Sequence, residues 1–169
     1  MKQDEREFER IYRDHAALVR RLVFRLCHPN DLDDLVQLVF VKVYEGLERL
    51  RESGSLKPWI CRIAVNVARD DLRRRRTRGW LSLFRAEEPQ EAASPAPTAE
   101  QAMGAGQELR AFVGGLTPKL QEVIVLFSVE ELEMKEIADT LAIPVGTVKS
   151  RLNEARKKLG SALREESDE

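Results

Sequence analysis

The segment IPVGTVKSRLNEARKKL, from Ile143 to Leu159, has residue types and a spacing that suit contact with DNA. Its apolar residues recur every three or four positions, which places them on one inward face of a helix; they are Val145, Val148, Leu152, Ala155 and Leu159. The opposite face carries Thr147, Lys149, Ser150, Arg151, Asn153, Glu154 and Arg156. Cations and hydroxyl groups suit phosphates, whereas amide, guanidinium and carboxylate groups suit base edges. The pattern predicts a helix that reads DNA.

Charge content alone would favour a different interpretation of this helix, a charged face that is merely solvated. The preceding residues change the balance. EMKEIADTLA predicts a short helix and Ala142-Ile143-Pro144 a tight turn, so a short helix, a turn and a longer polar helix follow one another. That order is typical of a helix-turn-helix, and the small Gly146 and Ser150 allow close approach to a duplex.

Glu154 is the unusual member of this helix, because a carboxylate is repelled by phosphates. Asn153 suits adenine, and the Glu154 carboxylate can accept a hydrogen bond from the amino group of cytosine. Alternatively, Glu154 pairs with Lys157 or Lys158 at helical spacing. Both interpretations stay open at the level of sequence.

A second cationic cluster occupies ARDDLRRRRTR and the residues before it. On a helix, Arg62, Arg69, Arg73 and Arg76 form one basic stripe with Asn66 on the same side, although the four consecutive arginines cannot all share it. Trp59 lies one turn earlier, and for its ring core packing is the better interpretation. Amide and cations beside an aromatic residue suit single-stranded DNA. We therefore predict that Arg62, Asn66, Arg69 and Arg73 bind a DNA strand.

A third feature is an acidic face with apolar members. Asp33, Asp34 and Gln37 are followed by Leu38 and Val41 on the same side of the expected helix. Apolar residues among charges indicate a surface for a protein partner. The alternative is that Leu38 only widens the apolar stripe that packs in the core.

Other function classes find little support. There is no phosphate-binding glycine motif, no Ser-His-Asp order and no metal-ligand spacing around His15 or His28, so catalytic, metal and cofactor sites are not expected. Cys27 and Cys61 stand apart and are expected to be reduced core thiols. No segment suits a signal peptide or membrane insertion, which predicts a cytoplasmic protein. The net charge is -1, so only local clusters can bind nucleic acid.

These groups must be positioned by helices. Periodicity predicts an all-α chain of two small helical domains, residues 1–78 and 106–169, with the helix-turn-helix in the second. Residues 79–105 are rich in Pro, Ala and Glu and predict a flexible linker, which starts with the unusually apolar GWLSLF.

Start and stop signals refine the helices. Asn30 is a plausible N-cap for the second helix, and Pro58 suits the first turn of the third. Thr117-Pro118 predicts the start of a helix that ends near Glu130. A short helix is expected from Glu108 to Val113.

Three ordered motifs in the chain are similar to those of one family. DLDDLVQLVFVKVYEGL, LKPWICRIAVNVARDDLRRRR and LTPKLQEVIVLFSVEELEMKEIADTLAIPVGTVKSRLNEARKKL resemble, in turn, the polymerase-docking, minus-ten and minus-thirty-five parts of the extracytoplasmic-function (ECF) group of bacterial sigma factors. The resemblance covers nearly everything outside the linker and the two ends.

The resemblance implies a factor that binds core RNA polymerase, directs it to promoter DNA and helps to melt the duplex. It implies that Asn66 and the loop ESGSLK bind the non-template strand, that Arg62, Arg69 and Arg73 contact phosphates, and that Asp33, Asp34 and Gln37 face the polymerase. It further implies that the acidic linker threads polymerase channels, and that an anti-sigma factor is a partner.

Three departures from the family pattern stand out. Leu38 occupies a position that is usually acidic, EELEM lacks the usual turn glycine, and Glu154 replaces a common basic residue. The main alternative function is a helix-turn-helix regulator that binds duplex operators without acting as a polymerase subunit. A second alternative is an interaction protein with no salt-dependent affinity for DNA.

Overall fold

The computed structural model describes residues 2–27, 29–50, 55–84, 113–128 and 130–165. Over these residues it is helical with no strand, which confirms the all-α prediction. The helices are α1 Lys2–Cys27, α2 Leu32–Leu50, α3 Leu56–Phe84, α5 Pro118–Ser128, α6 Met134–Leu141 and α7 Val145–Glu165. The linker and most of the helix expected from Glu108 to Val113 lie outside the described residues.

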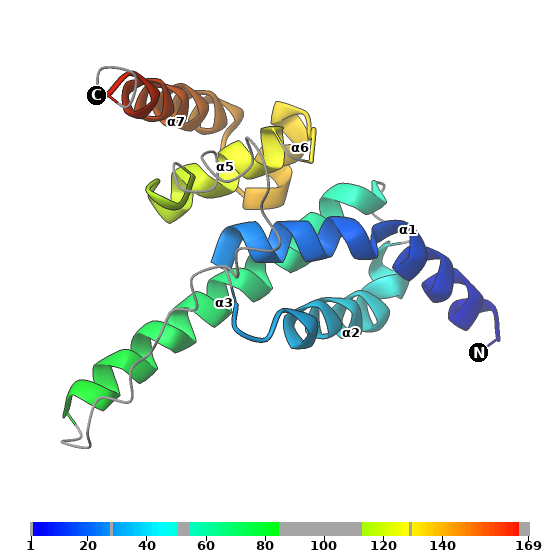
Figure 1. Cartoon of the computed structure of the whole chain (residues 1–169). Coiled ribbons are helices and arrows are strands. Elements are labelled where there is room, and N and C mark those ends of the chain that lie inside the picture. Colours follow the sequence, from blue (N-terminus) through cyan, green and yellow to red (C-terminus); the bar gives the residue numbers. More distant parts are fainter. Residues whose placement is uncertain (1, 28, 51–54, 85–112, 129, 166–169) are drawn as a thin grey trace.

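Helices α1, α2 and α3 pack against one another and form the N-terminal part of the molecule (Figure 1). Helix α2 begins one residue later than the predicted cap implied. Asp31, not Asn30, offers its carbonyl to the first helical turn, where it accepts the Leu35 amide at 3.3 Å. Asp is as good an N-cap as Asn, so the prediction of Asn30 was wrong by one residue. Asp33 and Asp34 do lie in the first turn, near the positive end of the helix.

Helix α3 is longer than the sequence indicated. It continues to Phe84 and so includes GWLSLF, which the sequence assigned to the start of the linker. Its C-terminal half projects away from the body of the molecule (Figure 1). GWLSLF thus forms the last turns of α3 rather than the start of the linker, and its side chains lie outside the described part of the structure.

The C-terminal helices form the predicted helix-turn-helix. Pro118 is the first residue of α5, and the Thr117 carbonyl accepts the amides of Leu120 and Gln121 at 2.9 Å each. Between α6 and α7, Ala142 takes a left-handed backbone with φ of 54° and its amide bonds the Ala138 carbonyl, which makes the predicted tight turn.

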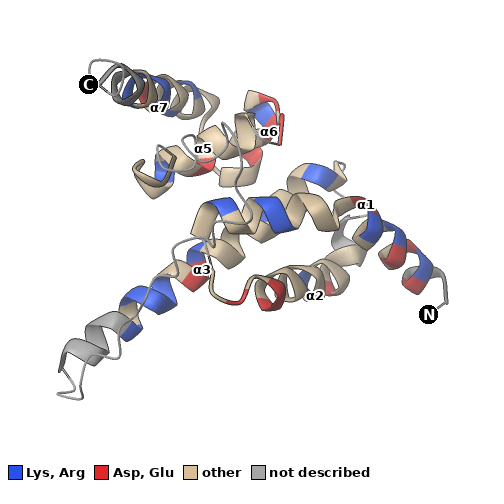
Figure 2. Ribbon diagram, viewed as in Figure 1, with Lys and Arg blue, Asp and Glu red and all other residues tan. Residues whose placement is uncertain are grey.

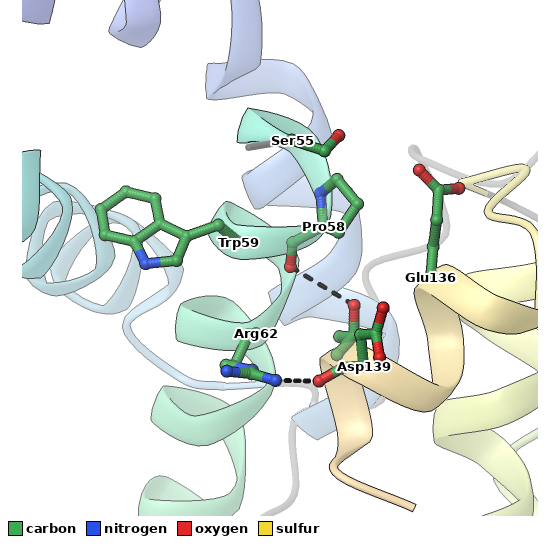
Figure 3. A pocket seen from close by; sticks show the side chains of 7 residues that line it. Ser55, Pro58, Trp59, Arg62, Glu136 and Asp139 are labelled. Carbon is green, nitrogen blue, oxygen red and sulfur yellow. Dashed lines mark hydrogen bonds between the residues drawn. The ribbon is translucent and has the colours of Figure 1, made fainter. Parts of the chain in front are cut away.

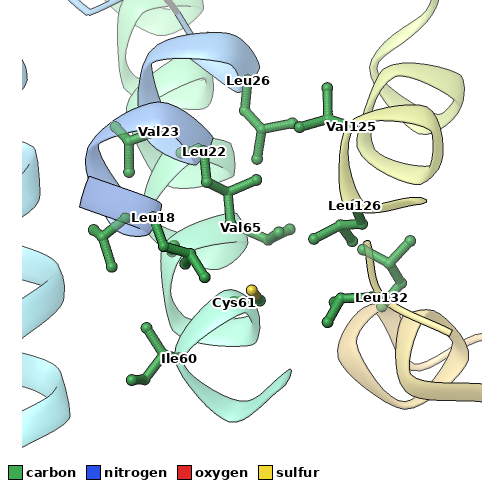
Figure 4. Packing of buried hydrophobic residues seen from close by; sticks show 14 of the residues in the cluster. Leu18, Leu22, Val23, Leu26, Ile60, Cys61, Val65, Val125, Leu126 and Leu132 are labelled. Atoms are coloured by element: carbon green, nitrogen blue, oxygen red, sulfur yellow. The ribbon is translucent and has the colours of Figure 1, made fainter. Parts of the chain in front are cut away.

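The two helical blocks share one hydrophobic core. Leu22 and Leu26 of α1, with Cys61 and Val65 of α3, lie opposite Val125 and Leu126 of α5 and Leu132 of the following turn (Figure 4). All of these side chains are buried. Two domains joined by a linker were expected from the sequence, but their packing against each other was not.

The turn between α5 and α6 contains a strained residue. Glu131 has φ of 53°, in the left-handed region that glycine occupies without a Cβ clash, and it lies in the EELEM segment that lacks a glycine. Glu131→Gly is therefore expected to raise the free energy of unfolding by about 0.5–1 kcal/mol, the relief of strain less the entropy glycine adds to the unfolded chain. Urea denaturation followed by circular dichroism measures it. Glu131→Ala keeps the Cβ and removes the same charge, so an equal gain in that control would contradict a backbone origin.

Candidate nucleic-acid interface

Helix α7 presents the polar face that the sequence predicted. Val148, Leu152 and Ala155 are buried against α5 and α6, which turns the other side of the helix to solvent. Lys149, Ser150, Asn153, Glu154 and Arg156 are exposed, and Thr147 and Arg151 are half-buried. The cations along this helix are visible in Figure 2. Val145 was expected to pack inward, but its side chain is 42% exposed. It is the first residue of α7 and lies beyond the part of the helix that packs against the core.

Two members of this face have partners within the domain. The Glu154 carboxylate lies 3.5 Å from the Lys158 ammonium, one turn further along α7. This is the intrahelical pair that the sequence left open. The Arg156 guanidinium stacks over the Phe127 ring of α5, 5.1 Å from its centroid. Lys149 and Asn153 occupy the same face among exposed neighbours, so they are the members best placed for a duplex.

The predicted strand-binding residues all lie on α3 but differ in their surroundings. Asn66 and Arg73 are exposed, and Arg73 lies 3.8 Å from Asp70 of its own helix. Arg62 instead donates to the Asp139 carbonyl of α6. Arg69 donates from Nε and Nη2 to the two carboxylate oxygens of Glu122 in α5, at 2.6 and 2.7 Å. Half of the predicted basic stripe is therefore engaged by the C-terminal domain.

The Arg69–Glu122 pair has the planar two-bond geometry that arginine also forms with phosphates. The Glu122 side chain is only 9% exposed, and its hydrogen bonds raise the pKa of Arg69 above its ordinary value. Arg75, in the same run of arginines, has a structural role, since it pairs with Asp71 and donates to the Cys27 carbonyl at the end of α1.

A cleft opens where α3 meets α6 (Figure 3). Pro58, Trp59 and Arg62 line one side, and Asp139 and Thr140 the other. The Thr140 hydroxyl donates to the Pro58 carbonyl at 3.3 Å across it. Its volume of about 230 Å³ is small for a ligand pocket. The Trp59 ring packs against the core and on Gly46, where an added Cβ would lie 2.7 Å from the ring, so core packing is confirmed for it.

The outer face of α2 exposes several of the residues that the sequence predicted to meet a protein partner. Asp34, Gln37, Val41 and Tyr44 recur at helical spacing, and all are exposed, Val41 by 52% and Tyr44 by 50%. The ring of Phe8 in α1 contacts Tyr44 edge to face at 5.2 Å, which extends the apolar area.

Tyr12 of α1 adds a further exposed ring to this surface, and its centroid lies 4.6 Å from that of Phe40 with the two ring planes tilted by 58°. Asp33 is ion-paired with Arg20 of α1. Leu38 is half-buried and packs against the core, so the alternative in which it widens the core stripe is the one observed. We call Asp34, Gln37, Val41 and Tyr44 the α2 stripe.

The cysteines behave as the sequence predicted. Cys27 and Cys61 are buried free thiols, and burial raises the pKa of each to about 12. Among the described residues, no group of His, Cys, Asp or Glu side chains could hold a metal ion. None of the described helices has the length and hydropathy of a membrane span.

Sequence reasoning missed the residues that join the two domains. Gln121, Glu122 and Glu130 are buried polar residues, and Glu130 was expected only as the end of a helix that in fact stops at Ser128. The only local signal was a carboxylate and an amide side by side within an otherwise apolar helix.

A helix-turn-helix whose second helix is exposed and polar, a basic helix in the three-helix block and an exposed stripe on α2 together suit a two-domain transcription factor. Comparison with known families is consistent with this class. Residues 11–78 match the model of Sigma-70 region 2, and residues 106–159 match that of Sigma-70, region 4.

Curated relatives extend over most of the chain. The ECF RNA polymerase sigma-E factor of Escherichia coli K12 is 30% identical over 96% of this chain and 89% of that protein. The ECF RNA polymerase sigma factor SigE of Mycolicibacterium smegmatis is 31% identical over 96% of this chain, which spans 63% of that protein. The chain belongs to the ECF sigma factors, the promoter-directing initiation factors of RNA polymerase.

Solved structures share the arrangement of helices. CnrH in complex with the cytosolic domain of CnrY is similar with a TM-score of 0.69 and 26% identity, over 95% of this chain and 89% of that one. The sigma factor RpoE of Bartonella quintana, solved with the anti-sigma factor NepR, has a TM-score of 0.75 at 21% identity, over 94% of this chain and 97% of that one, and shows the same fold.

Proposed function

We propose that this sigma factor carries core RNA polymerase to a promoter of two elements, reads the minus-thirty-five element with α7 and opens the minus-ten element with α3. The observation that carries the proposal is that the basic helix α3 and the exposed polar helix α7 lie in two domains, each matched to its own sigma region. A helix-turn-helix regulator of duplex operators would leave the basic helix α3 without a role.

The proposed division of labour follows the exposure of the side chains. The exposed Lys149 and Arg156, with the half-buried Arg151 between them, hold the duplex backbone, and the exposed Asn153 reads a base edge. On α3, Asn66 binds a non-template base that has left the stack, and Arg73 neutralises a nearby phosphate. The unstacking costs a few kcal/mol, which the contacts of Asn66 with the base and of Arg73 with the phosphate offset.

The α2 stripe is the proposed contact with core polymerase. Its N-terminal half, Asp34 and Gln37, is polar and its C-terminal half, Val41 and Tyr44, is apolar, so the stripe offers both the apolar area and the hydrogen-bonding groups that protein interfaces combine. The factor would act in the cytoplasm, where the polymerase is. Since CnrH and RpoE were solved with partner proteins, we also propose an anti-sigma factor as a regulator.

Run-off transcription with purified core enzyme on a library of random promoter templates tests the function. The expected result is transcription that needs both proteins, with permanganate-reactive thymines near minus ten. Failure of the chain to co-purify with core polymerase would contradict the proposal, whereas specific duplex binding without polymerase would favour the regulator.

Glu154 gives a prediction about promoter choice. Because its carboxylate is paired with Lys158, Glu154→Arg is expected to tighten duplex binding uniformly across promoter sequences, with a salt dependence steeper by about one counterion. Fluorescence anisotropy with the assembled holoenzyme on several promoters, over a range of salt, measures both. Glu154→Gln removes the charge without adding a cation and is the matched control. A preference that shifts between promoters would instead mean that Glu154 reads a base.

A further inference from the structure

The contact between the two domains involves residues that the DNA would need. We use "interdomain interface" for the contacts of α1 and α3 with α5, α6 and the turn between them. Arg62 and Arg69 of α3 lie in it, bound to the Asp139 carbonyl and the Glu122 carboxylate. Further polar contacts between described residues join Arg21 to Glu130, Lys57 to the Glu130 carbonyl, Gln121 to the Arg25 carbonyl and Thr140 to the Pro58 carbonyl.

The closed arrangement cannot read both promoter elements at once. Elements named for positions minus ten and minus thirty-five lie 25 base pairs apart, about 85 Å along B-DNA at roughly 3.4 Å per pair. In the structure α5 contacts both α3, through Glu122, and α7, and α7 itself spans only about 32 Å for its 21 residues. The two DNA-facing helices are therefore too close together.

Covalent geometry allows the domains to separate. Residues 85–112 connect them, and a chain of that length reaches at most about 95 Å when fully extended. Binding to a promoter of two elements therefore requires the interdomain interface to break, and with it the bonds of Arg62 and Arg69.

We propose that the free factor holds itself closed through this interface, and that Glu122 occupies on Arg69 the place that a DNA phosphate takes when the factor opens. The inference rests on the proposed function. A carboxylate bound through Nε and Nη2 blocks the same two donors that a phosphate uses, so the two ligands exclude each other. Because Glu122 is almost fully buried, it cannot release Arg69 and stay in place without an unpaired charge.

The remaining predicted contacts stay accessible in the closed form. Asn66, Arg73 and the α2 stripe are exposed, as is the outer face of α7. Core polymerase can thus dock on α2 before the domains part. In the closed form Arg62 and Arg69 cannot contact DNA, and the two domains cannot span both promoter elements. Core polymerase can still make its first contact with the factor.

Cys61 supplies a native reporter of opening. Its thiol is fully buried between α3 and the C-terminal domain, beside Leu126 and Leu132 (Figure 4). Burial, with a smaller effect of Glu130, raises its pKa to about 12, so a thiol reagent reacts slowly while the domains are together. A Cys27→Ala background leaves Cys61 as the single thiol.

The test is Glu122→Gln in the full chain with that background. One readout is the rate of Cys61 modification by an aromatic disulfide, and the other is affinity for a fluorescein-labelled single-stranded 15-mer of random sequence. Losing the charge-assisted pair is expected to raise the rate about tenfold and to tighten DNA binding several-fold. Glu45→Gln, an exposed position on α2 with the same charge change, is the matched control and is expected to alter neither by more than about twofold.

Unchanged Cys61 reactivity in Glu122→Gln, or a gain in DNA affinity no larger than that of Glu45→Gln, would overturn the closed form. Should Glu122→Gln lose helical signal, Gln121→Ala removes the bond to the Arg25 carbonyl without a change of charge and must still accelerate Cys61 modification. Loss of run-off transcription in the unaltered protein would instead refute the promoter function while leaving these two readouts intact.

Discussion

Val41→Glu is expected to weaken the binding of this sigma factor to core RNA polymerase by about 30- to 100-fold, the effect of losing a central residue of an interface. Val41 is 52% exposed in the middle of the α2 stripe, so the change places a charge where the partner must exclude water. The fold is expected to be unaffected, because the side chain has no place in the core.

Titration of labelled core enzyme, followed by anisotropy, measures this affinity. Val145→Glu is the matched control, since Val145 is another exposed valine, 42% accessible, at the start of α7 in the other domain. Its affinity for core enzyme is expected to stay within about twofold of the unaltered protein. Equal losses in the two variants would show that the α2 stripe is not the contact.

The second large effect is expected at Asn66. Asn66→Ala should reduce formation of the open promoter complex at least tenfold while closed-complex affinity changes less than about twofold, because its amide acts on a base only after the base leaves the stack. Permanganate reactivity measures opening, and mobility shift at low temperature measures the closed complex. Both assays use the assembled holoenzyme.

Arg73→Ala provides the comparison for Asn66. Arg73 is exposed on the same helix and proposed to contact a phosphate, so its loss should weaken binding uniformly across sequences and lower the salt dependence by about one counterion. A pattern in which Asn66→Ala weakens both steps equally would contradict the strand-trapping role and make Asn66 another backbone contact.

Local features of this fold could be predicted from the sequence because each depends on neighbouring residues. Thr117-Pro118 begins a helix for reasons contained in two residues, and the turn at Ala142 follows from the break in periodicity before Pro144. The α7 faces follow in the same way, with an error only at Val145, where a helix end departs from the periodic pattern.

The interdomain interface could not be predicted because its pairs lie far apart in the chain. Arg69 and Glu122 are separated by 53 residues, and Arg21 and Glu130 by 109. The sequence pattern of a basic residue on a helix is the same whether that residue binds a DNA phosphate or a carboxylate of the same chain. Periodicity shows which face is polar and leaves the partner unknown.

Glu130 is a buried residue of the interdomain interface that disfavours the closed form. Its side chain is 1% exposed, its Oε2 accepts from Arg21 at 3.2 Å, and its Oε1 has no hydrogen-bond partner among the described residues. Such an oxygen is better off in water, so every separation of the domains recovers hydration that closure had removed. The closed form is therefore stabilised by its apolar contacts and destabilised by this buried carboxylate, and Glu130→Leu is expected to shift the equilibrium between closed and open forms towards the closed one.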